Sequence, residues 1–310
     1  MSTFLVTGGC GFIGSHLCEA LTGLGHHIRV VDDLSTGKRE NLFGRESLVV
    51  GDIADPDLMR EAVAGIDGCF HLAAIASVER GRQAWVETHR TNLTGAITVF
   101  DAVRRLPNAA EIPVVYASSA AVYGDCRTLP IEEGMEKVPL SAYGADKYGC
   151  EHHARVATGV HGVPTVGLRF FNVYGPRQDP HSPYSGVISI FCNKLRRGER
   201  IDIYGDGEQT RDFIYVKDVV NVLLRAMQRP LRNAPVFNVC TGRATSVLQL
   251  ADTIAGLLGQ PAEIRFCPAR SGEIRHSTGS PARAQAALDL PPTTFLRDGL
   301  AEVLGWLEQG

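Results

Sequence analysis

The stretch TFLVTGGCGFIGSHL near the start of the chain constrains the fold more than any other part of the sequence. The apolar run Phe4–Thr7 predicts a strand, and the pattern over Phe12–Leu24 predicts a helix that begins almost at once. Between them, Gly8, Gly11 and Gly14 have the spacing GxxGxxG. Such glycines allow a tight turn, let the backbone approach a pyrophosphate, and leave a helix N-terminus facing the phosphates. The stretch predicts a phosphate-binding turn, although a glycine-rich turn without a ligand has the same local pattern.

Two acidic residues at the ends of later strands extend this interpretation. The stretch HIRVVDDLSTG places Asp32 18 residues after Gly14. A carboxylate there accepts a hydrogen bond from a ribose 2′-hydroxyl and repels a 2′-phosphate, which favours NAD over NADP. In VVGDIAD, Asp52 follows a strand and is expected to contact the adenine amine, the alternative being a helix cap or turn residue. The three features together predict that the chain binds NAD.

Apolar runs alternate with helix-length segments through the first half of the chain. The expected strands are Phe4–Thr7, Ile28–Val31, Ser47–Val50, Cys69–Leu72, Val114–Ala117 and Thr165–Arg169, and the expected helices are Phe12–Leu24, Asp57–Val63, Trp85–Arg105 and Tyr143–Thr158. Strands without polar alternation, separated by helices, are typical of a parallel sheet covered on both faces. We therefore expect an α/β fold with a Rossmann-like doubly wound parallel sheet and a smaller C-terminal substrate-binding domain.

The rhythm of strands and helices breaks after about residue 175, where prolines and glycines cluster. A further strand, Val236–Val239, and a helix, Val247–Leu258, are expected to return to the sheet. We predict two domains. The NAD-binding domain consists of residues 1–174, to which about 211–258 return in part. The smaller, substrate-binding domain consists of residues 175–210 and 259–310.

Composition excludes several classes of function. The formal net charge of −3 on 310 residues gives no general attraction to nucleic acid or to an anionic membrane, and no apolar run is long enough to span a bilayer. We expect no signal peptide, because no basic segment followed by an apolar one precedes the first strand. The eight cysteines form no CxxC pair and the histidines no HExxH motif, so we expect reduced thiols, no metal site and a cytoplasmic location.

The reacting groups are expected on one helix and one strand end. In YGADK, Tyr143 and Lys147 are four residues apart and share a helix face. A free tyrosine has a pKa of about 10, and a nearby ammonium together with an oxidised nicotinamide favours the phenolate of such a group. In VVYASSAAVYG, Ser118 and Ser119 follow a strand at the sheet edge where ligands bind. A surface Tyr–Lys pair and a turn-capping serine are the alternatives.

The motifs GGCGFIG, Ser119, YGADK and RFFNVYGPRQDP occur in the order seen in one family. The chain resembles the extended short-chain dehydrogenases/reductases, in their nucleotide-sugar epimerase/dehydratase branch, and the resemblance covers essentially the whole sequence. It implies Ser119, Tyr143 and Lys147 as catalytic residues. The cofactor residues that it implies are Gly8, Gly11, Phe12, Ile13, Gly14, Asp32, Asp33, Leu34, Ser35, Gly37, Asp52, Ile53, Leu72, Ala73, Ala74, Asn92, Ser118, Tyr143, Lys147 and Phe170.

The residues after Ser119 narrow the activity within this branch. The 4,6-dehydratases carry an Asp-Glu pair there and the UDP-glucuronate decarboxylases a glutamate, whereas this chain has Ala120 and Ala121. The resemblance therefore implies a 4-epimerase similar to UDP-N-acetylglucosamine and UDP-glucose 4-epimerases, acting through a 4-keto sugar. A UDP-glucuronate 4-epimerase, a nucleotide-sugar reductase or dehydrogenase, and a non-enzymatic NAD-sensing protein stay open as alternatives.

The resemblance also implies the substrate contacts and an oligomeric state. The expected contacts are Ser119, Tyr143, Asn172, Val187, Tyr204, Arg211, Arg270, Glu273 and Ser277. In the 4-epimerases, one position lies four residues after the acid that binds the ribose, and that acid corresponds to Glu273 in this chain. The position holds a bulky tyrosine in hexose-only enzymes and a small residue in those that accept N-acetylhexosamines. Ser277 at this position favours UDP-GlcNAc and UDP-GalNAc, with UDP-Glc and UDP-Gal as a second pair. The family commonly forms homodimers through the helices expected at Trp85–Arg105 and Tyr143–Thr158.

Overall fold

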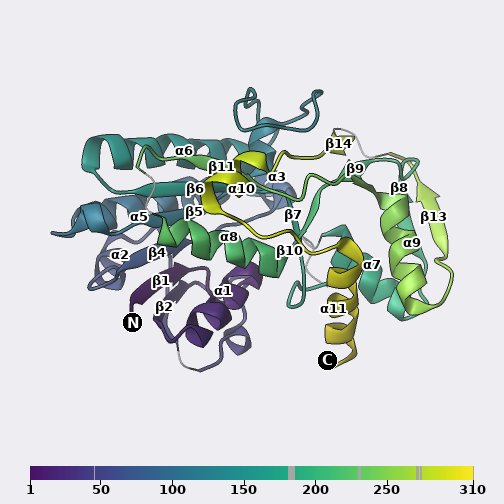
Figure 1. The fold of residues 1–310 in the computed structure, drawn as a ribbon, viewed down its shortest axis with the longest axis horizontal. Helices are drawn as coiled ribbons and strands as arrows, with labels where there is room; N and C mark the ends of the chain where they lie inside the picture. The colour runs from purple at the N-terminus through teal and green to yellow at the C-terminus, as the bar shows by residue number, and fades with distance from the viewer. Residues whose placement is uncertain (45, 181–185, 230–231, 270–271, 273, 310) are drawn as a thin grey trace.

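A seven-stranded parallel sheet forms the centre of the molecule in the computed structural model (Figure 1). The structure describes residues 1–44, 46–180, 186–229, 232–269, 272 and 274–309. In the order in which they pair, the strands are β11 (Val236–Val239), β6 (Thr165–Phe170), β5 (Val114–Ser119), β4 (Gly68–His71), β1 (Thr3–Thr7), β2 (His27–Asp32) and β3 (Ser47–Val50). The order changes direction at β1, so the helices that follow β1 and β4 pack on opposite faces of the sheet, the arrangement at which open α/β sheets bind ligands.

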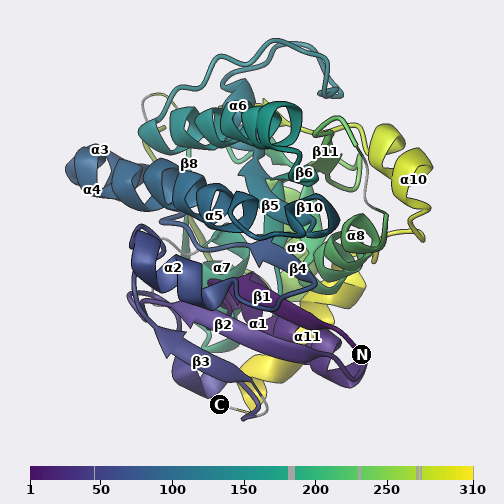
Figure 2. The same cartoon turned by 90° about the vertical axis from the view of Figure 1, so that its left-hand side faces the viewer.

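Helices cover both faces of the sheet, as Figure 2 shows. One layer contains α2 (Pro56–Ala62), α5 (Gly95–Arg104) and α6 (Ala142–His161), and the other contains α1 (Phe12–Gly23), α8 (Val216–Gln228) and α10 (Ala282–Leu288). Successive strand residues serve the two layers in turn: Leu5 packs with the first and Val6 with the second. This is why the strands are apolar without alternation, and it confirms the predicted doubly wound α/β fold.

A smaller unit lies beside the carboxyl ends of the strands, at the right of Figure 1. Its core is formed by α7 (Val187–Arg196), α9 (Val247–Leu258), α11 (Leu296–Glu308) and β8 (Ile201–Tyr204), and β13 (Ile264–Cys267) pairs with β8. The expected helix Val247–Leu258 is therefore present, but it packs against α7 and α11 instead of returning to the sheet. The expected strand Val236–Val239 does return, as β11. The domain boundaries themselves stay a prediction.

Short strands connect the two units. β7 (Asn172–Tyr174) pairs with β10 (Phe213–Tyr215), and β9 (Thr210–Arg211) lies between β12 (Thr245–Ser246) and β14 (His276–Ser277). Figure 1 shows β7 and β10 between the large sheet and the smaller unit, with β9 and β14 above them.

The expected long helix Trp85–Arg105 is interrupted. The chain forms α3 (Val78–Gln83), α4 (Trp85–His89), a π-helical turn η2 (Arg90–Thr94) and then α5. A π-helical turn accommodates an extra residue without ending the helix, and such turns are frequent at functional sites. Helical periodicity over Trp85–Arg105 does not distinguish this arrangement from a regular helix.

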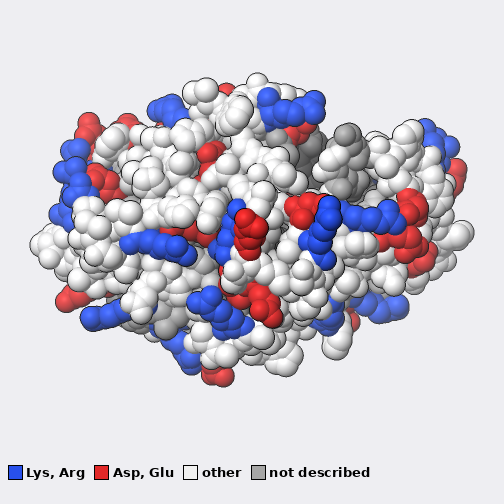
Figure 3. Space-filling view, turned by 90° about the horizontal axis from the view of Figure 1, so that it is seen from above, with Lys and Arg blue, Asp and Glu red and all other residues white. Residues whose placement is uncertain are grey.

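No helix in the described ranges is long and apolar enough to cross a lipid bilayer. On the face shown in Figure 3, basic and acidic side chains are interspersed instead of gathering in patches of one sign.

A buried ion pair joins α6 to the sheet. Arg169 on β6 is 2% exposed and Glu151 on α6 is 1% exposed. Two hydrogen bonds link them: Arg169 Nε donates to Glu151 Oε1 at 2.8 Å, and an Arg169 terminal nitrogen donates to Oε2 at 2.7 Å. The other terminal nitrogen of Arg169 donates to the Tyr123 hydroxyl at 2.6 Å, and Ser118 Oγ donates to Glu151 Oε1 at 2.6 Å. Every charged atom of this pair therefore has a partner inside the protein.

Removing one member of this pair leaves the other charge buried and uncompensated. We expect Glu151→Gln to lower the free energy of unfolding by about 3–5 kcal/mol, measured by urea denaturation. Glu199→Gln is the matched control, because Glu199 pairs with Arg197 at 3.9 Å on the surface; it should change the free energy by less than about 1 kcal/mol. Equal effects of the two substitutions would contradict a structural role for the buried pair.

Candidate functional site

The glycine-rich turn brings two backbones into direct contact. Gly8 has φ of +73°, and a Cβ atom on it would lie 2.7 Å from the Ala73 nitrogen. A Cβ atom on Gly14 would collide with the carbonyl oxygen of Gly8. The turn after β1 therefore packs closely against the loop after β4 and against the first turn of α1, and larger residues at either glycine would separate them.

Asp32, at the end of β2, is held in one orientation by the backbone. Its Oδ2 accepts from the Cys10 nitrogen at 3.0 Å and its Oδ1 from the Leu34 nitrogen at 2.9 Å. Burial raises the pKa of Asp32, and these two hydrogen bonds oppose the rise. A Cβ atom on Gly37 would lie 2.8 Å from Asp32 Oδ1, so the loop passes directly over the carboxylate. A fixed acceptor at the end of the second strand suits a ribose hydroxyl.

A cavity of about 270 Å³ runs along the carboxyl ends of the strands. All the predicted cofactor residues line it except Leu34 and Asn92. The lining residues that sequence reasoning missed are Thr36, Gly51, Ile75, Ala76, Thr91 and Ala117. Five of these six directly neighbour predicted residues in the sequence, and Ala76 continues the loop of Ala73 and Ala74. Thr91, the neighbour of Asn92, lies on the π-helical turn.

Asn92 and Leu34, the two predicted cofactor residues that do not line the cavity, instead make hydrogen bonds that position its walls. Asn92 is fully buried on the π-helical turn; its Oδ1 accepts from the Ile75 nitrogen at 2.8 Å and its Nδ2 donates to the Ile75 oxygen at 3.2 Å. It thereby positions the loop after β4. The Leu34 side chain packs against the apolar core, while its backbone nitrogen orients Asp32.

Asp52 lines the cavity and also makes local contacts. Its Oδ1 accepts from the Ala54 nitrogen at 2.8 Å, and its Oδ2 lies 3.0 Å from a terminal nitrogen of Arg90. Asp52 therefore does act as a turn residue in the structure, and its contact with an adenine amine stays a prediction. Asp33 similarly accepts from both the backbone nitrogen and the hydroxyl of Ser35.

Tyr143 and Lys147 lie on the first two turns of α6, which begins after Ser141, whose side chain accepts from the Gly144 nitrogen. Both side chains line the cavity. Lys147 is 1% exposed; its Nζ donates to the Ala117 oxygen at 3.0 Å and lies 5.9 Å from the centre of the Tyr143 ring. The helix face and the end of β5 thus bring a phenol and an ammonium together at one end of the cavity.

The two serines that end β5 have different surroundings. Ser118 is buried, lines the cavity and donates to Glu151, as described above. Ser119 is half-buried, is not among the residues lining the cavity, and its Oγ accepts from the Ala121 nitrogen at 3.1 Å. The Ser119 hydroxyl proton is not used in that bond, so it can still be donated to a ligand. Ala120 and Ala121 follow and supply no carboxylate.

Three of the predicted substrate residues lie on neighbouring short strands. Arg211 on β9 is directly opposite Ser277 on β14, and the Asn172 nitrogen on β7 donates to the oxygen of Asp212, the residue after Arg211. Tyr204 ends β8 and Val187 begins α7, both in the smaller unit. Arg270 and Glu273 lie outside the described residues.

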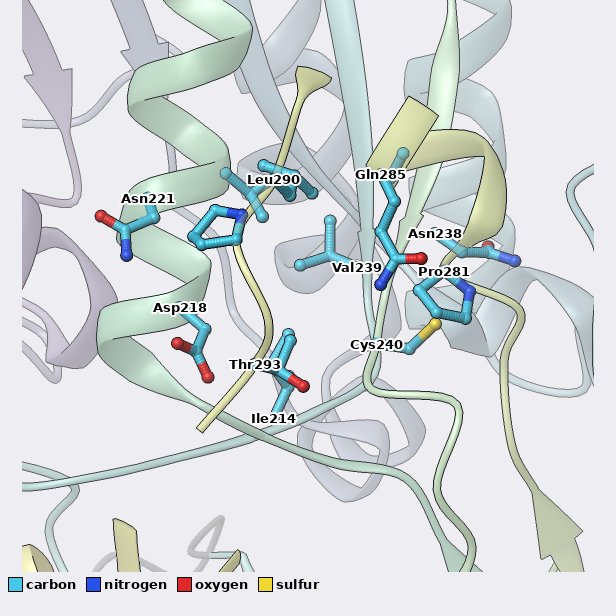
Figure 4. A pocket seen from close by; sticks show the side chains of 13 residues that line it. Ile214, Asp218, Asn221, Asn238, Val239, Cys240, Pro281, Gln285, Leu290 and Thr293 are labelled. Carbon is cyan, nitrogen blue, oxygen red and sulfur yellow. The ribbon is translucent and has the colours of Figure 1, made fainter. Parts of the chain in front are cut away.

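A second cavity lies between α8, β11 and α10 (Figure 4). Its volume is about 20 Å³, room for a single water molecule, and none of the predicted site residues lines it. In the described part of the chain, no group of three or more His, Cys, Asp or Glu side chains is arranged to hold a metal ion.

The residues of the large cavity fit a dinucleotide. The glycine turn allows the backbone and the N-terminus of α1 to approach a pyrophosphate, Asp32 offers an oriented acceptor at one end, and Tyr143 with Lys147 lies at the other. These are the positions that adenosine, pyrophosphate and nicotinamide require in such a fold.

Comparison with known proteins agrees with this geometry. The NAD dependent epimerase/dehydratase family matches residues 4–240. UDP-glucose 4-epimerase of Mycolicibacterium smegmatis is 38% identical over 97% of this chain and 96% of its own length. The structure of UDP-glucose 4-epimerase from Thermotoga maritima with UDP-glucose is 34% identical, with a TM-score of 0.94 over 99% of both chains.

A third similar protein carries a different sugar name. UDP-N-acetylglucosamine 4-epimerase from Methanobrevibacter ruminantium, solved with UDP-N-acetylmuramic acid, is 32% identical, with a TM-score of 0.94 over 99% of this chain and 98% of its own. The resemblance inferred from the motifs is thereby confirmed, and the chain belongs to the NAD-dependent epimerase/dehydratase family of enzymes.

Proposed function

We propose that the protein interconverts UDP-sugars that differ in configuration at C4, with UDP-GlcNAc and UDP-GalNAc as the main pair and UDP-Glc and UDP-Gal as a second pair. Two observations support this reaction type. Tyr143 and Lys147 lie together at one end of the cavity, and the residues that follow the nearby end of β5 are Ala120 and Ala121, which carry no acid-base group. Chemistry at C4 needs one acid-base group, whereas loss of water or CO₂ requires further side chains near C5 and C6 that this segment does not supply.

The chain's own residues account for the proton transfers. Tyr143 takes the proton of the 4-hydroxyl group and later returns it, while Ser119 donates a hydrogen bond to the same sugar oxygen. Lys147, fixed by Ala117, supplies a positive charge beside the phenol. NAD, when bound, supplies the hydride acceptor and donor for C4, with no net oxidation over the cycle.

The substrate end is assigned to residues on the short strands and in the smaller unit. We assign Asn172, Arg211 and Arg270 to the diphosphate, because a guanidinium matches phosphate through its planar fork. Tyr204 and Val187 are assigned to the nucleoside side and Glu273 to the ribose. Ser277, half-buried opposite Arg211, leaves room beside the sugar C2 substituent that a tyrosine would fill.

We also propose a homodimer formed through α4 and α6. Apolar side chains are exposed on both helices: Trp85 at 67%, Val86 at 83%, Val156 at 46% and Val160 at 71%. Helix faces with this much exposed apolar surface favour burial against a second protein.

We expect the purified protein to carry NAD(H) rather than NADP(H). Asp32 lies where a 2′-phosphate would have to approach a carboxylate, and a reaction without net oxidation never requires the cofactor to leave. Mass spectrometry of the supernatant after denaturation identifies the nucleotide. Recovery of NADP(H) would contradict the assignment of Asp32.

Tyr143→Phe should lower kcat by about 10²–10⁴-fold, because the phenol oxygen is the acid-base group of the proposed reaction. The affinity for UDP-sugar should change much less, since the ring remains. Tyr148→Phe, on the same helix with its ring against His152, is the matched control and should retain activity. A Tyr143→Phe enzyme as active as the wild type would rule out this tyrosine as the base.

Ser277→Tyr should abolish activity on UDP-GlcNAc while sparing activity on UDP-Glc, because the phenol occupies the space assigned to the N-acetyl group. Ser277→Ala is the control and should retain both. NMR of the sugar anomeric protons after incubation with UDP-GlcNAc, UDP-Glc and UDP-GlcA follows each reaction. A wild-type enzyme that converts only UDP-GlcA would identify the glucuronate epimerase instead.

A further inference from the structure

Asp212, the residue between β9 and β10, is fully buried, and its carboxylate accepts four hydrogen bonds. Oδ1 accepts from the Thr241 nitrogen at 2.8 Å and from the Thr241 hydroxyl at 2.7 Å. Oδ2 accepts from the Gly242 nitrogen at 2.9 Å and from the Gly279 nitrogen at 3.3 Å. Burial raises the pKa of Asp212, and these hydrogen bonds oppose the rise. All four lone-pair directions of the carboxylate are therefore in use.

The four donors come from segments that are far apart in the sequence. Thr241 and Gly242 follow β11 and lead into β12, while Gly279 follows β14. Both β12 and β14 pair with β9, which ends one residue before Asp212. One carboxylate thus ties together the three strands of the small sheet.

Gly279 shows how closely these segments are packed. A Cβ atom there would lie 2.5 Å from Phe171 Cζ and 2.7 Å from Cys240 Sγ. The backbone nitrogen of Gly279 reaches Asp212 only because no side chain intervenes, so the segment after β14 has little freedom to take another path.

Three of the residues assigned to the substrate are connected to Asp212 through the backbone. Arg211 directly precedes Asp212, Ser277 lies opposite Arg211 in the strand register, and the Asn172 nitrogen donates to the Asp212 main-chain oxygen at 3.0 Å. We propose that Asp212 is a positioning residue for the diphosphate end of the substrate site, setting the relative places of Asn172, Arg211 and Ser277 without touching the substrate. The inference rests on the proposed function.

The effect of Asp212 should be confined to one end of the active site. Neither Asp212 nor its donors, Thr241, Gly242 and Gly279, line the cofactor cavity. The residues at the reacting end, Tyr143 and Lys147, are held separately through α6 and Ala117. Loss of the carboxylate should therefore weaken binding of the nucleotide part of the substrate and leave the cofactor and the chemical step largely intact.

An isosteric amide tests the role of the carboxylate. Asn at position 212 offers one acceptor oxygen, and its NH₂ group faces backbone N–H donors, so two of the four hydrogen bonds are lost. With UDP as the probe, isothermal titration calorimetry should show a Kd for Asp212→Asn at least about tenfold above that of the wild type. The KM for UDP-glucose should rise in parallel, while kcat at saturation and the NAD(H) content per chain change less than about threefold.

Thr241→Val is a milder variant that keeps the Thr241 nitrogen and removes its hydroxyl donor to Asp212. It should raise the Kd for UDP in the same direction by a smaller factor. Thr253→Val is the matched control, because the Thr253 hydroxyl donates to Gln249 on the exposed side of α9; it should leave the Kd unchanged.

The outcomes separate the inference from the function on which it rests. A wild-type protein that does not bind UDP would contradict the proposed function and the inference with it. A wild type that binds UDP, with Asp212→Asn and Thr241→Val binding it equally well, would overturn the inference alone. Loss of NAD(H), kcat and thermal stability in step with UDP affinity in both variants would show a structural role only, which also overturns it.

Discussion

The ion pair between Arg169 and Glu151 is the interaction on which the arrangement of the active site depends. Tyr143, Lys147 and Glu151 are spaced by four residues, so all three lie on the face of α6 that meets the sheet. The first two line the cofactor cavity, and the third holds the helix against β6 by two charge-assisted hydrogen bonds. Because Ser118 donates to the same carboxylate, the end of β5 that carries Ser119 is fixed to the helix that carries the tyrosine.

The same network continues toward the substrate end. Arg169 donates to Tyr123, whose hydroxyl donates to Asn238 Oδ1 at 2.7 Å, and Asn238 Nδ2 donates to the Ile131 oxygen at 2.9 Å. The Ile131 backbone pairs with the segment after β14: its nitrogen donates to the Thr278 oxygen and its oxygen accepts from the Ser280 nitrogen, each at 2.8 Å. Gly279, between these two residues, donates to Asp212. A series of hydrogen bonds therefore connects the helix that carries Tyr143 and Lys147 with the strands assigned to the UDP-sugar.

Sequence reasoning succeeded where structure is determined locally. The glycine turn, the strand ending in Asp32 and the helix that carries Tyr143 and Lys147 each follow from residues close together in the chain. It failed where a distant partner decides. Helical periodicity over Trp85–Arg105 does not distinguish the π-helical turn from a regular helix, and the apolar face of α9 does not reveal that α7 and α11 cover it. By contrast, α8 was detectable: Val216, Val219, Val220, Leu223 and Met227 have helical spacing that the surrounding glycines and prolines obscured. The clustering of Asn172, Arg211 and Ser277 depends on strand pairings between segments far apart, which no local pattern encodes.

The order of strands in the large sheet has a consequence for how the chain reaches its native state. β1, the first strand in the sequence, is central, and it pairs with β2 across a single helix. β11 pairs with β6, although β7 to β10, α7 and α8 lie between these two strands in the sequence. Closing such a long segment costs more entropy than closing a short one, so the topology favours early assembly of β1 with its neighbours and late docking of β11. Thr241 and Gly242 follow β11, separated from its last residue only by Cys240. The docking of β11 therefore also brings these hydrogen-bond donors to Asp212. The same topology favours completion of the nucleotide-sugar end of the molecule after the cofactor-binding strands have assembled.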